Sequence, residues 1–176
     1  MTTRRVVALA LMLAVVSAPV LADTKATFTL PSGVKVKIIE APFDKKLFKI
    51  SGCTESSATC FINGHVPFGF DGGLPGTYVK TISVSYRNQS YSLDASHMYN
   101  AWGSRPLEYK GFVRYFGGKC FNTKHCQFRG LFSDGAGSFV AEWQVINGLP
   151  TRTVLSDQYD IMDLFTRHID PPEYGE

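Results

Sequence analysis

Hydrophobic and polar residues alternate along several short segments of this chain, which is the pattern of β-strands with one buried face. Residues 81–86 and 138–146 alternate most regularly, and the second segment places four apolar side chains on one side: Phe139, Ala141, Trp143 and Val145. Turn-forming residues separate such segments, and Asn147-Gly148 is the strongest short hairpin signal among them. The pattern predicts three hairpins, over residues 26–40, 81–93 and 138–155.

Two helices and further strands complete the predicted fold. Asp94 is placed to cap a short helix over residues 94–102. A second helix, capped by Ser156 or Asp157, has an apolar stripe and runs to Ile169. Further strands are predicted over residues 47–50, 111–116 and 127–133, and the last two are joined by a disulfide-closed turn. Together these elements predict an α+β domain, a mainly antiparallel β-sheet or partly open barrel with one short and one C-terminal helix.

The N-terminal segment, residues 1–22, has the features of a cleavable export signal. Two arginines precede an unbroken apolar run over residues 6–16, and Ala22 ends a small-residue cleavage pattern. The run is shorter than the roughly 20 residues that a bilayer span needs, and no later segment approaches that length. We therefore expect a periplasmic protein without a membrane span, beginning near Asp23 and forming a single globular domain over residues 23–176.

Composition and charge narrow the class of partner. The chain has 13 Phe, 8 Tyr and 2 Trp, an aromatic content that suits packed β-strands. Its formal net charge of +3 includes the two arginines of the N-terminal segment, so the mature chain carries 16 Lys and Arg against 15 Asp and Glu. Nucleic-acid-binding domains are strongly basic, with clustered charge. We therefore expect no nucleic-acid partner.

The four cysteines, Cys53, Cys60, Cys120 and Cys126, all follow the predicted signal. An even number of cysteines in an exported protein indicates disulfide bonds, here two. Three pairings are possible, and we favour Cys53 with Cys60 and Cys120 with Cys126, because each pair closes a short local loop. A zinc site is the alternative, but the spacings exceed the two to four residues of zinc knuckles.

The sequence carries no recognisable catalytic or metal-binding motif. It has no G-x-S-x-G nucleophile pattern, and its four histidines are not spaced to put two imidazoles on one helical face: His65, His97, His125 and His168. We therefore expect no metal, no cofactor and no enzyme activity. An enzyme remains an alternative if distant residues assemble a site, with His97 or His125 beside a carboxylate in a deep pocket.

The segment between Cys120 and Cys126 is the candidate partner-binding element. A short disulfide loop is stiff, and a loop that is already ordered loses little entropy when it docks. An aromatic residue in it suits an apolar pocket, and its cationic and imidazole groups suit acidic or catalytic groups in a partner's cleft. The candidate contact residues are Phe121, Asn122, Lys124 and His125. The alternative is that the disulfide only stabilises an exposed hairpin and has no role in binding.

In this loop the sequence resembles the periplasmic lysozyme inhibitors of the Ivy type, which present a histidine from a disulfide-closed loop. The corresponding histidine is His125, although this loop has five residues between the cysteines, Cys120 and Cys126, where that family has four. More broadly, the chain resembles the small disulfide-bonded periplasmic immunity proteins of Gram-negative bacteria. The resemblance implies a protein that inhibits a cell-wall-degrading or other toxic hydrolase by occluding its active site. A structural envelope protein without a single target is a further alternative.

Overall fold

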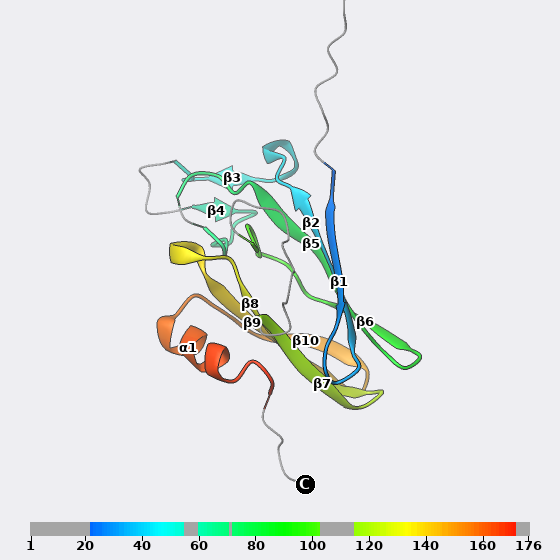
Figure 1. The fold of residues 1–176 in the computed structure, drawn as a ribbon. Helices are drawn as coiled ribbons and strands as arrows, with labels where there is room; N and C mark the ends of the chain where they lie inside the picture. Colours follow the sequence, from blue (N-terminus) through cyan, green and yellow to red (C-terminus); the bar gives the residue numbers. More distant parts are fainter. Residues whose placement is uncertain (1–21, 55–59, 71, 103–114, 172–176) are drawn as a thin grey trace, which may run out of the picture.

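The computed structural model describes residues 22–54, 60–70, 72–102 and 115–171, and within them two four-stranded antiparallel sheets pack together (Figure 1). The first sheet has the strand order β1-β2-β5-β6, and the second has the order β10-β9-β8-β7. The first comprises β1 (Thr24–Thr29), β2 (Lys35–Pro42), β5 (Thr77–Tyr86) and β6 (Gln89–Leu93). The second comprises β7 (Phe116–Asn122), β8 (His125–Phe132), β9 (Phe139–Ile146) and β10 (Leu149–Ser156). A small sheet pairs β3 (Ile50–Ser51) with β4 (Phe61–Ile62), and α1 (Tyr159–Arg167) follows β10.

The inward faces of the two large sheets form one hydrophobic core. Val36 and Ile82 from the first sheet are fully buried with Phe128 and Trp143 from the second. The Trp143 ring stacks on Phe116, with ring centroids 6.0 Å apart. Its indole nitrogen donates a hydrogen bond to a backbone carbonyl in the segment after β6, so the polar atom of this buried ring is satisfied.

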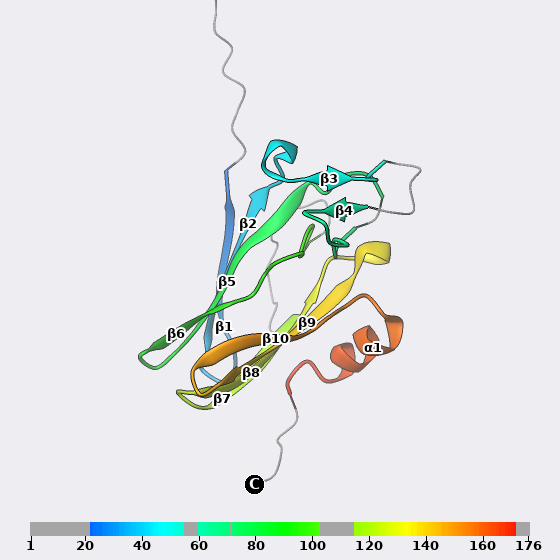
Figure 2. The ribbon, with the colours of Figure 1, turned by 180° about the vertical axis from the view of Figure 1, so that it is seen from behind.

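The outward face of the second sheet is covered in part by α1, as Figure 2 shows from behind. Phe165 is the buried residue of this helix, and the Arg129 guanidinium lies 4.9 Å from its ring centroid. Glu142, which points away from the inner core, is therefore buried as well. The regular alternation in β9 correctly predicted the inner face, but it could not show that a helix would shield the other one.

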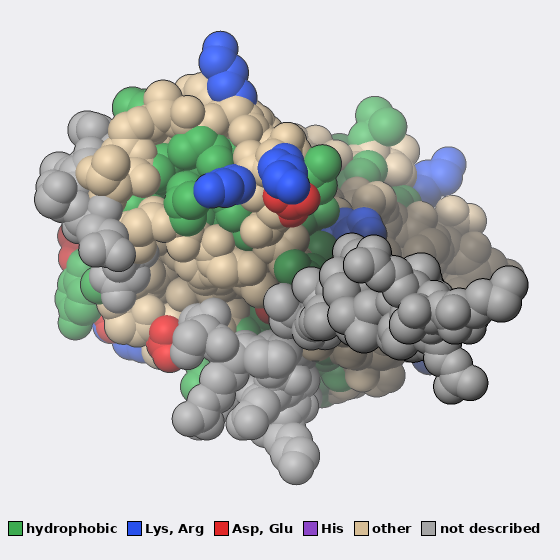
Figure 3. Space-filling view, turned by 90° about the horizontal axis from the view of Figure 1, so that it is seen from above, with side chains coloured by type: hydrophobic (Ala, Val, Ile, Leu, Met, Phe, Trp, Pro, Cys, Tyr) green, Lys and Arg blue, Asp and Glu red, His purple; other side chains and the backbone are tan. Residues whose placement is uncertain are grey.

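A smaller hydrophobic cluster lies at the end of the molecule formed by β3, β4 and the 3₁₀ helix Lys45–Leu47. Phe43 stacks on Phe48 with ring centroids 4.5 Å apart, and the Tyr99 ring meets Phe43 edge to face. The Cys53–Cys60 disulfide belongs to this cluster. Figure 3 looks onto this end and shows hydrophobic side chains at the surface beside Lys and Arg side chains.

The short helix predicted over residues 94–102 is wrong. Asp94 caps a turn, accepting a hydrogen bond from the Ser96 amide at 2.9 Å, and Met98 and Tyr99 then form bridges to two neighbouring segments. The Met98 carbonyl accepts from Val79 at 2.9 Å, and the Tyr99 amide donates to the Phe68 carbonyl at 2.8 Å. These bonds to other segments replace the bonds within one helix, because the backbone groups of this segment are used between strands.

Most of the other predicted strands and helices are present in the structure. The three predicted hairpins are confirmed as β1–β2, β5–β6 and β9–β10, and the C-terminal helix is confirmed as α1. The predicted cap at Ser156 or Asp157 is wrong, because the helix starts later, with Gln158 as its N-cap. A partly open barrel is not confirmed, since the described strands form separate open sheets. The strand predicted over residues 47–50 is reduced to β3, because residues 45–47 form a 3₁₀ helix. Most of the strand predicted over residues 111–116 lies outside the described residues.

The predicted export signal also lies almost wholly outside the described residues. Strand β1 begins at Thr24, so cleavage after Ala22 would leave every described strand in the mature chain. No helix in the described part of the chain is long and apolar enough to cross a membrane.

Candidate binding site

The candidate binding element is the tip of the β7–β8 hairpin. Cys120 and Cys126 pair directly across its two strands and are joined by a disulfide, which confirms the predicted pairing. The predicted hairpin is present, but its strands continue beyond the cysteines, so the turn is confined to Thr123 and Lys124. The Lys124 amide donates to the Asn122 side-chain oxygen at 2.8 Å, which closes the turn locally.

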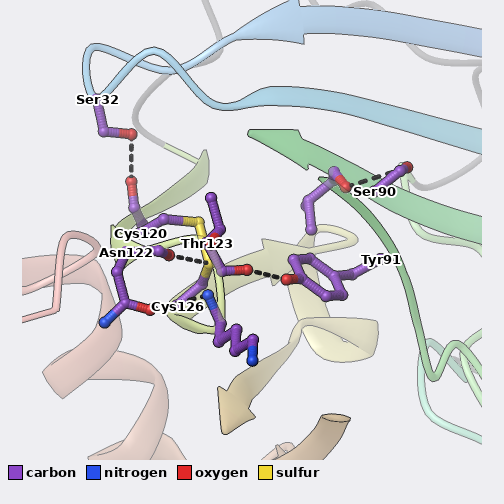
Figure 4. The surroundings of a disulfide bond; sticks show 10 residues. Ser32, Ser90, Tyr91, Cys120, Asn122, Thr123 and Cys126 are labelled. Carbon is purple, nitrogen blue, oxygen red and sulfur yellow. Dashed lines mark hydrogen bonds between the residues drawn. A yellow bond between two sulfur atoms is a disulfide. The ribbon is translucent and has the colours of Figure 1, made fainter. Parts of the chain in front are cut away.

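Three neighbouring hairpins hold this tip in place, two of them visible in Figure 4. The Tyr91 hydroxyl on β6 donates to the Thr123 carbonyl, and the Gly148 amide of the β9–β10 turn donates to the Lys124 carbonyl at 3.0 Å. At the base of the hairpin, the Ser32 hydroxyl of the β1–β2 turn donates to the Gly118 carbonyl at 2.7 Å. The tip is thus fixed by its disulfide and by bonds to three other parts of the chain.

The four predicted contact residues are all exposed at the surface, but they differ in whether the side chain is already used in a hydrogen bond within the turn. Phe121 is 44 % exposed, and its ring centroid lies 5.3 Å from that of His125. Lys124 and His125 are exposed as well. Asn122 is exposed, yet its side-chain oxygen already accepts from the turn, so it acts in shaping the tip. The Lys119 ammonium lies 5.1 Å from the Phe121 ring centroid, on the same hairpin.

The structure adds two apolar residues that the sequence analysis did not single out. Ile146 and Leu149 flank the β9–β10 turn, pair with each other, and are 51 % and 71 % exposed. Because Cys126 pairs with Val145, the next residues outward, His125 and Ile146, lie opposite each other at the tip. The strong Asn147-Gly148 signal had located this turn, but only the register between β8 and β9 places it beside the disulfide hairpin.

Comparisons with known proteins give no further assignment of this site. No protein-family model, curated protein or solved structure matches this chain. The likeness to the Ivy-type inhibitors therefore stays a prediction, carried by the residues of the hairpin.

A second group of side chains, away from the hairpin tips, bears on the enzyme alternative. The structure brings His65 and His97 together, with ring centroids 4.2 Å apart, although they are far apart in the sequence. His97 lines an open cavity of about 280 Å³ together with Tyr78, Lys80 and Tyr99. Burial lowers the pKa of His97, the nearby His65 and Arg152 lower it further, and Asp94 acts in the opposite direction.

Within the described ranges, no cluster of three or more His, Cys, Asp or Glu side chains could hold a metal ion. The Asp94 carboxylate is directed to Arg152, at 3.2 Å, and to the Ser96 amide. The two imidazoles therefore form a pair beside a cavity, with the Asp94 carboxylate engaged elsewhere.

Proposed function

We propose that this chain is an exported, periplasmic binding protein that inhibits a partner protein, a toxic or cell-wall-degrading hydrolase, by placing the Cys120–Cys126 hairpin in its cleft. The observation that carries the proposal is the braced tip, which presents exposed Phe121, Lys124 and His125 on a fixed backbone. In this role the chain performs no chemistry and needs no cofactor. It acts by steric occlusion, as an immunity protein would.

The rigidity of the tip supports this proposal on energetic grounds. Ordering a flexible side chain at an interface costs about 0.5–1.5 kcal/mol, and ordering a mobile loop costs more. A tip already held by a disulfide and by Tyr91, Gly148 and Ser32 avoids most of the backbone part of this cost. More of the contact energy of Phe121 and His125 then appears as affinity.

The two disulfides support the export part of the proposal. Disulfide bonds persist in oxidising compartments such as the bacterial periplasm and are rare in the reducing cytosol. Both cysteine pairs are oxidised here, and the described residues contain no free cysteine. The signal-like segment over residues 1–22 would direct the chain to that compartment.

Affinity capture tests the proposed function. The full chain, expressed with its own N-terminal segment and a C-terminal tag, is used to capture partners from periplasmic extract and from the products of neighbouring genes. We expect one stoichiometric hydrolase, inhibited on binding, and released when Phe121→Ala and His125→Ala are combined. A matched control, Lys45→Glu with Lys46→Glu at the opposite end, should still inhibit it. Capture of a hydrolase that remains fully active would contradict the proposal.

Removing the tip disulfide should affect binding more than folding. Cys120→Ser with Cys126→Ser is expected to lower the free energy of unfolding by roughly 2 kcal/mol, from the short loop it closes. It should weaken binding to the captured partner by at least about tenfold, because the tip loses preorganisation. Denaturant unfolding and calorimetric binding measure the two effects.

The second disulfide provides the control for this prediction. Cys53 and Cys60 are seven residues apart and Cys120 and Cys126 six, so the two loops are nearly equal in length. The variant Cys53→Ser with Cys60→Ser should lose similar stability while keeping its affinity. Equal loss of affinity in both double variants would mean that the tip disulfide stabilises the fold and does not preorganise the binding element.

A second candidate function is an enzyme with its site at the cavity beside His97. The observation that favours it is the contact between His65 and His97 next to that cavity. The capture experiment distinguishes the two candidate functions. A variant with His65→Ala and His97→Ala keeps full inhibition if the hairpin is the functional element, whereas an enzyme would lose its turnover in this variant.

A further inference from the structure

Building on the proposed function, we infer that the docking surface is larger than the disulfide hairpin and selects a partner protein with an acidic surface. The four hairpin turns of the two large sheets gather at one end of the molecule, opposite β3 and β4 (Figures 1 and 2). We call this surface the hairpin end and define it as residues 30–35, 86–89, 119–126 and 146–150.

Hydrogen bonds show that these segments form one surface. The β1–β2 turn contacts β7 through Ser32, and the β9–β10 turn contacts the tip through Gly148. Strand β6, which leaves the β5–β6 turn, contacts the tip through Tyr91. The four segments come from all parts of the chain, yet each is bonded to the β7–β8 hairpin directly or through the next few residues.

The charge on the hairpin end is of one sign. Its four segments contain Lys35, Arg87, Lys119 and Lys124, and they contain no Asp or Glu, although the chain as a whole has 15 acidic residues. Lys35, Arg87 and Lys124 are exposed. One carboxylate, that of Asp170, lies just outside this surface and accepts from the Gly118 amide at 3.2 Å. The resulting positive field favours approach by an acidic surface and raises the association rate.

The hairpin end also carries apolar side chains among these cations. Phe121, Ile146 and Leu149 are exposed beside one another along the tip, next to the His125 ring. Apolar and aromatic anchors surrounded by polar and charged residues are the usual composition of a protein interface. Hydrophobic contact would supply affinity here, and the cations would supply selectivity.

The placement of the apolar residues favours a protein over a lipid surface. Binding to a lipid surface scales with the apolar area that the protein buries in it. Here Pro31 is the one apolar residue at the centres of the four turns, which are Pro31-Ser32, Arg87-Asn88, Thr123-Lys124 and Asn147-Gly148. Ile146 and Leu149 are set back on the strand ends. A nucleic acid is disfavoured because a mature chain with 16 cations and 15 anions has little excess positive charge.

The test uses poly-L-glutamate as an acidic polypeptide probe and follows the amide NMR spectrum of the oxidised chain, expressed with its own N-terminal segment and purified after export. We expect shifts confined to the hairpin end, and dissociation at about 0.5 M NaCl, where screening shortens electrostatic range to a few ångströms. The variant Lys35→Glu with Arg87→Glu, which leaves the disulfide hairpin untouched, should weaken binding about tenfold. The control Lys45→Glu with Lys46→Glu, which has the same change in charge at the opposite end, should bind as the original chain does.

Several outcomes would overturn the inference. These are the absence of binding to poly-L-glutamate, equal weakening in the two charge-reversal variants, and salt-resistant co-sedimentation with phosphatidylglycerol vesicles. Its failure is distinguishable from failure of the proposed function. In one outcome, the Lys35→Glu, Arg87→Glu variant inhibits the captured hydrolase as strongly as the original chain does. This result would support inhibition by the disulfide hairpin alone and would overturn the larger surface for an acidic partner. Binding of poly-L-glutamate at the hairpin end without any inhibited hydrolase supports the surface and overturns the hydrolase target.

Discussion

Replacing Arg129 with methionine is expected to lower the free energy of unfolding by about 3–5 kcal/mol, because the change leaves a buried carboxylate without its counter-ion. The Arg129 Nε donates to Glu142 at 2.7 Å, and both residues are less than a tenth exposed, at 8 % and 7 %. The same guanidinium donates to the His168 carbonyl at 2.8 Å and so ties the end of α1 to β8. Urea unfolding followed by tryptophan fluorescence measures the loss.

The control for this prediction removes both charges. Arg129→Met combined with Glu142→Leu should recover most of the lost stability, since buried ion pairs replaced by apolar groups of similar size are often neutral. If the double variant is as unstable as Arg129→Met alone, the loss comes from packing against Phe165 and not from the unpaired carboxylate.

The same ion pair predicts how stability depends on pH. Burial raises the pKa of Glu142, but hydrogen bonds from Arg129, Thr153 and Gln127 and the charge of Arg129 outweigh it, so the pKa lies below its ordinary value of 4.5. A carboxyl with a lowered folded-state pKa contributes stability that is fully present above the unfolded-state pKa and is lost as pH falls through the folded-state pKa. We expect this contribution to disappear below pH 4.5 in the original chain and to be absent from the double variant.

Replacing Trp143 with alanine should cost about 3–5 kcal/mol in unfolding free energy, the range for deleting a large buried aromatic side chain. Trp143 is fully buried between the two sheets and stacks on Phe116. Its indole nitrogen also donates to the Asp94 carbonyl at 2.8 Å, which anchors the segment leading to His97. Thermal and denaturant unfolding of the oxidised chain measure the change.

Trp143→Phe separates packing from anchoring in this prediction. It keeps most of the apolar volume and removes the hydrogen bond, so it should cost less than the alanine change, about 1–2 kcal/mol. Faster amide exchange in residues 95–99 of the Phe variant would show the loss of the anchor. An equal cost for both changes would contradict the idea that burial of the ring dominates.

The parts of the fold that the sequence predicted are those set by neighbours along the chain. The β9–β10 hairpin follows from alternation on both sides of Asn147-Gly148, and α1 follows from its apolar stripe and its polar start. Both disulfides join cysteines across short segments, so their pairing needed no knowledge of the tertiary fold. Local geometry decides all of these features.

The predictions that failed depend on contacts between distant segments. The helix expected over residues 94–102 had a capping residue and a suitable apolar spacing, but pairing of Met98 and Tyr99 with Phe68 and Val79 prevailed. His97 and Asn100 have positive φ angles of 64° and 41°, a conformation that a right-handed helix excludes. Such backbone pairing has no signature in a single local segment.

Some features of the candidate site follow from the local sequence, and others depend on contacts between distant segments. Exposure of Phe121, Lys124 and His125 follows from their place near the turn of a short hairpin, which the cysteine spacing already suggested. The bracing by Ser32 and Tyr91 could not be predicted, since it requires the first sheet to be placed against the second. The contact of His65 with His97 likewise depends on how the small sheet docks.

The local disulfides have a consequence for how this chain matures. Each bond joins cysteines six or seven residues apart and lies within one hairpin region, and neither links the two large sheets. Closing a loop of about ten residues takes only tens of nanoseconds, far less than the assembly of distant strands. Oxidative folding therefore favours the native pairs over long-range mispairs from the start. Formation of both bonds needs an oxidant, but there is little need of an isomerase to reshuffle them.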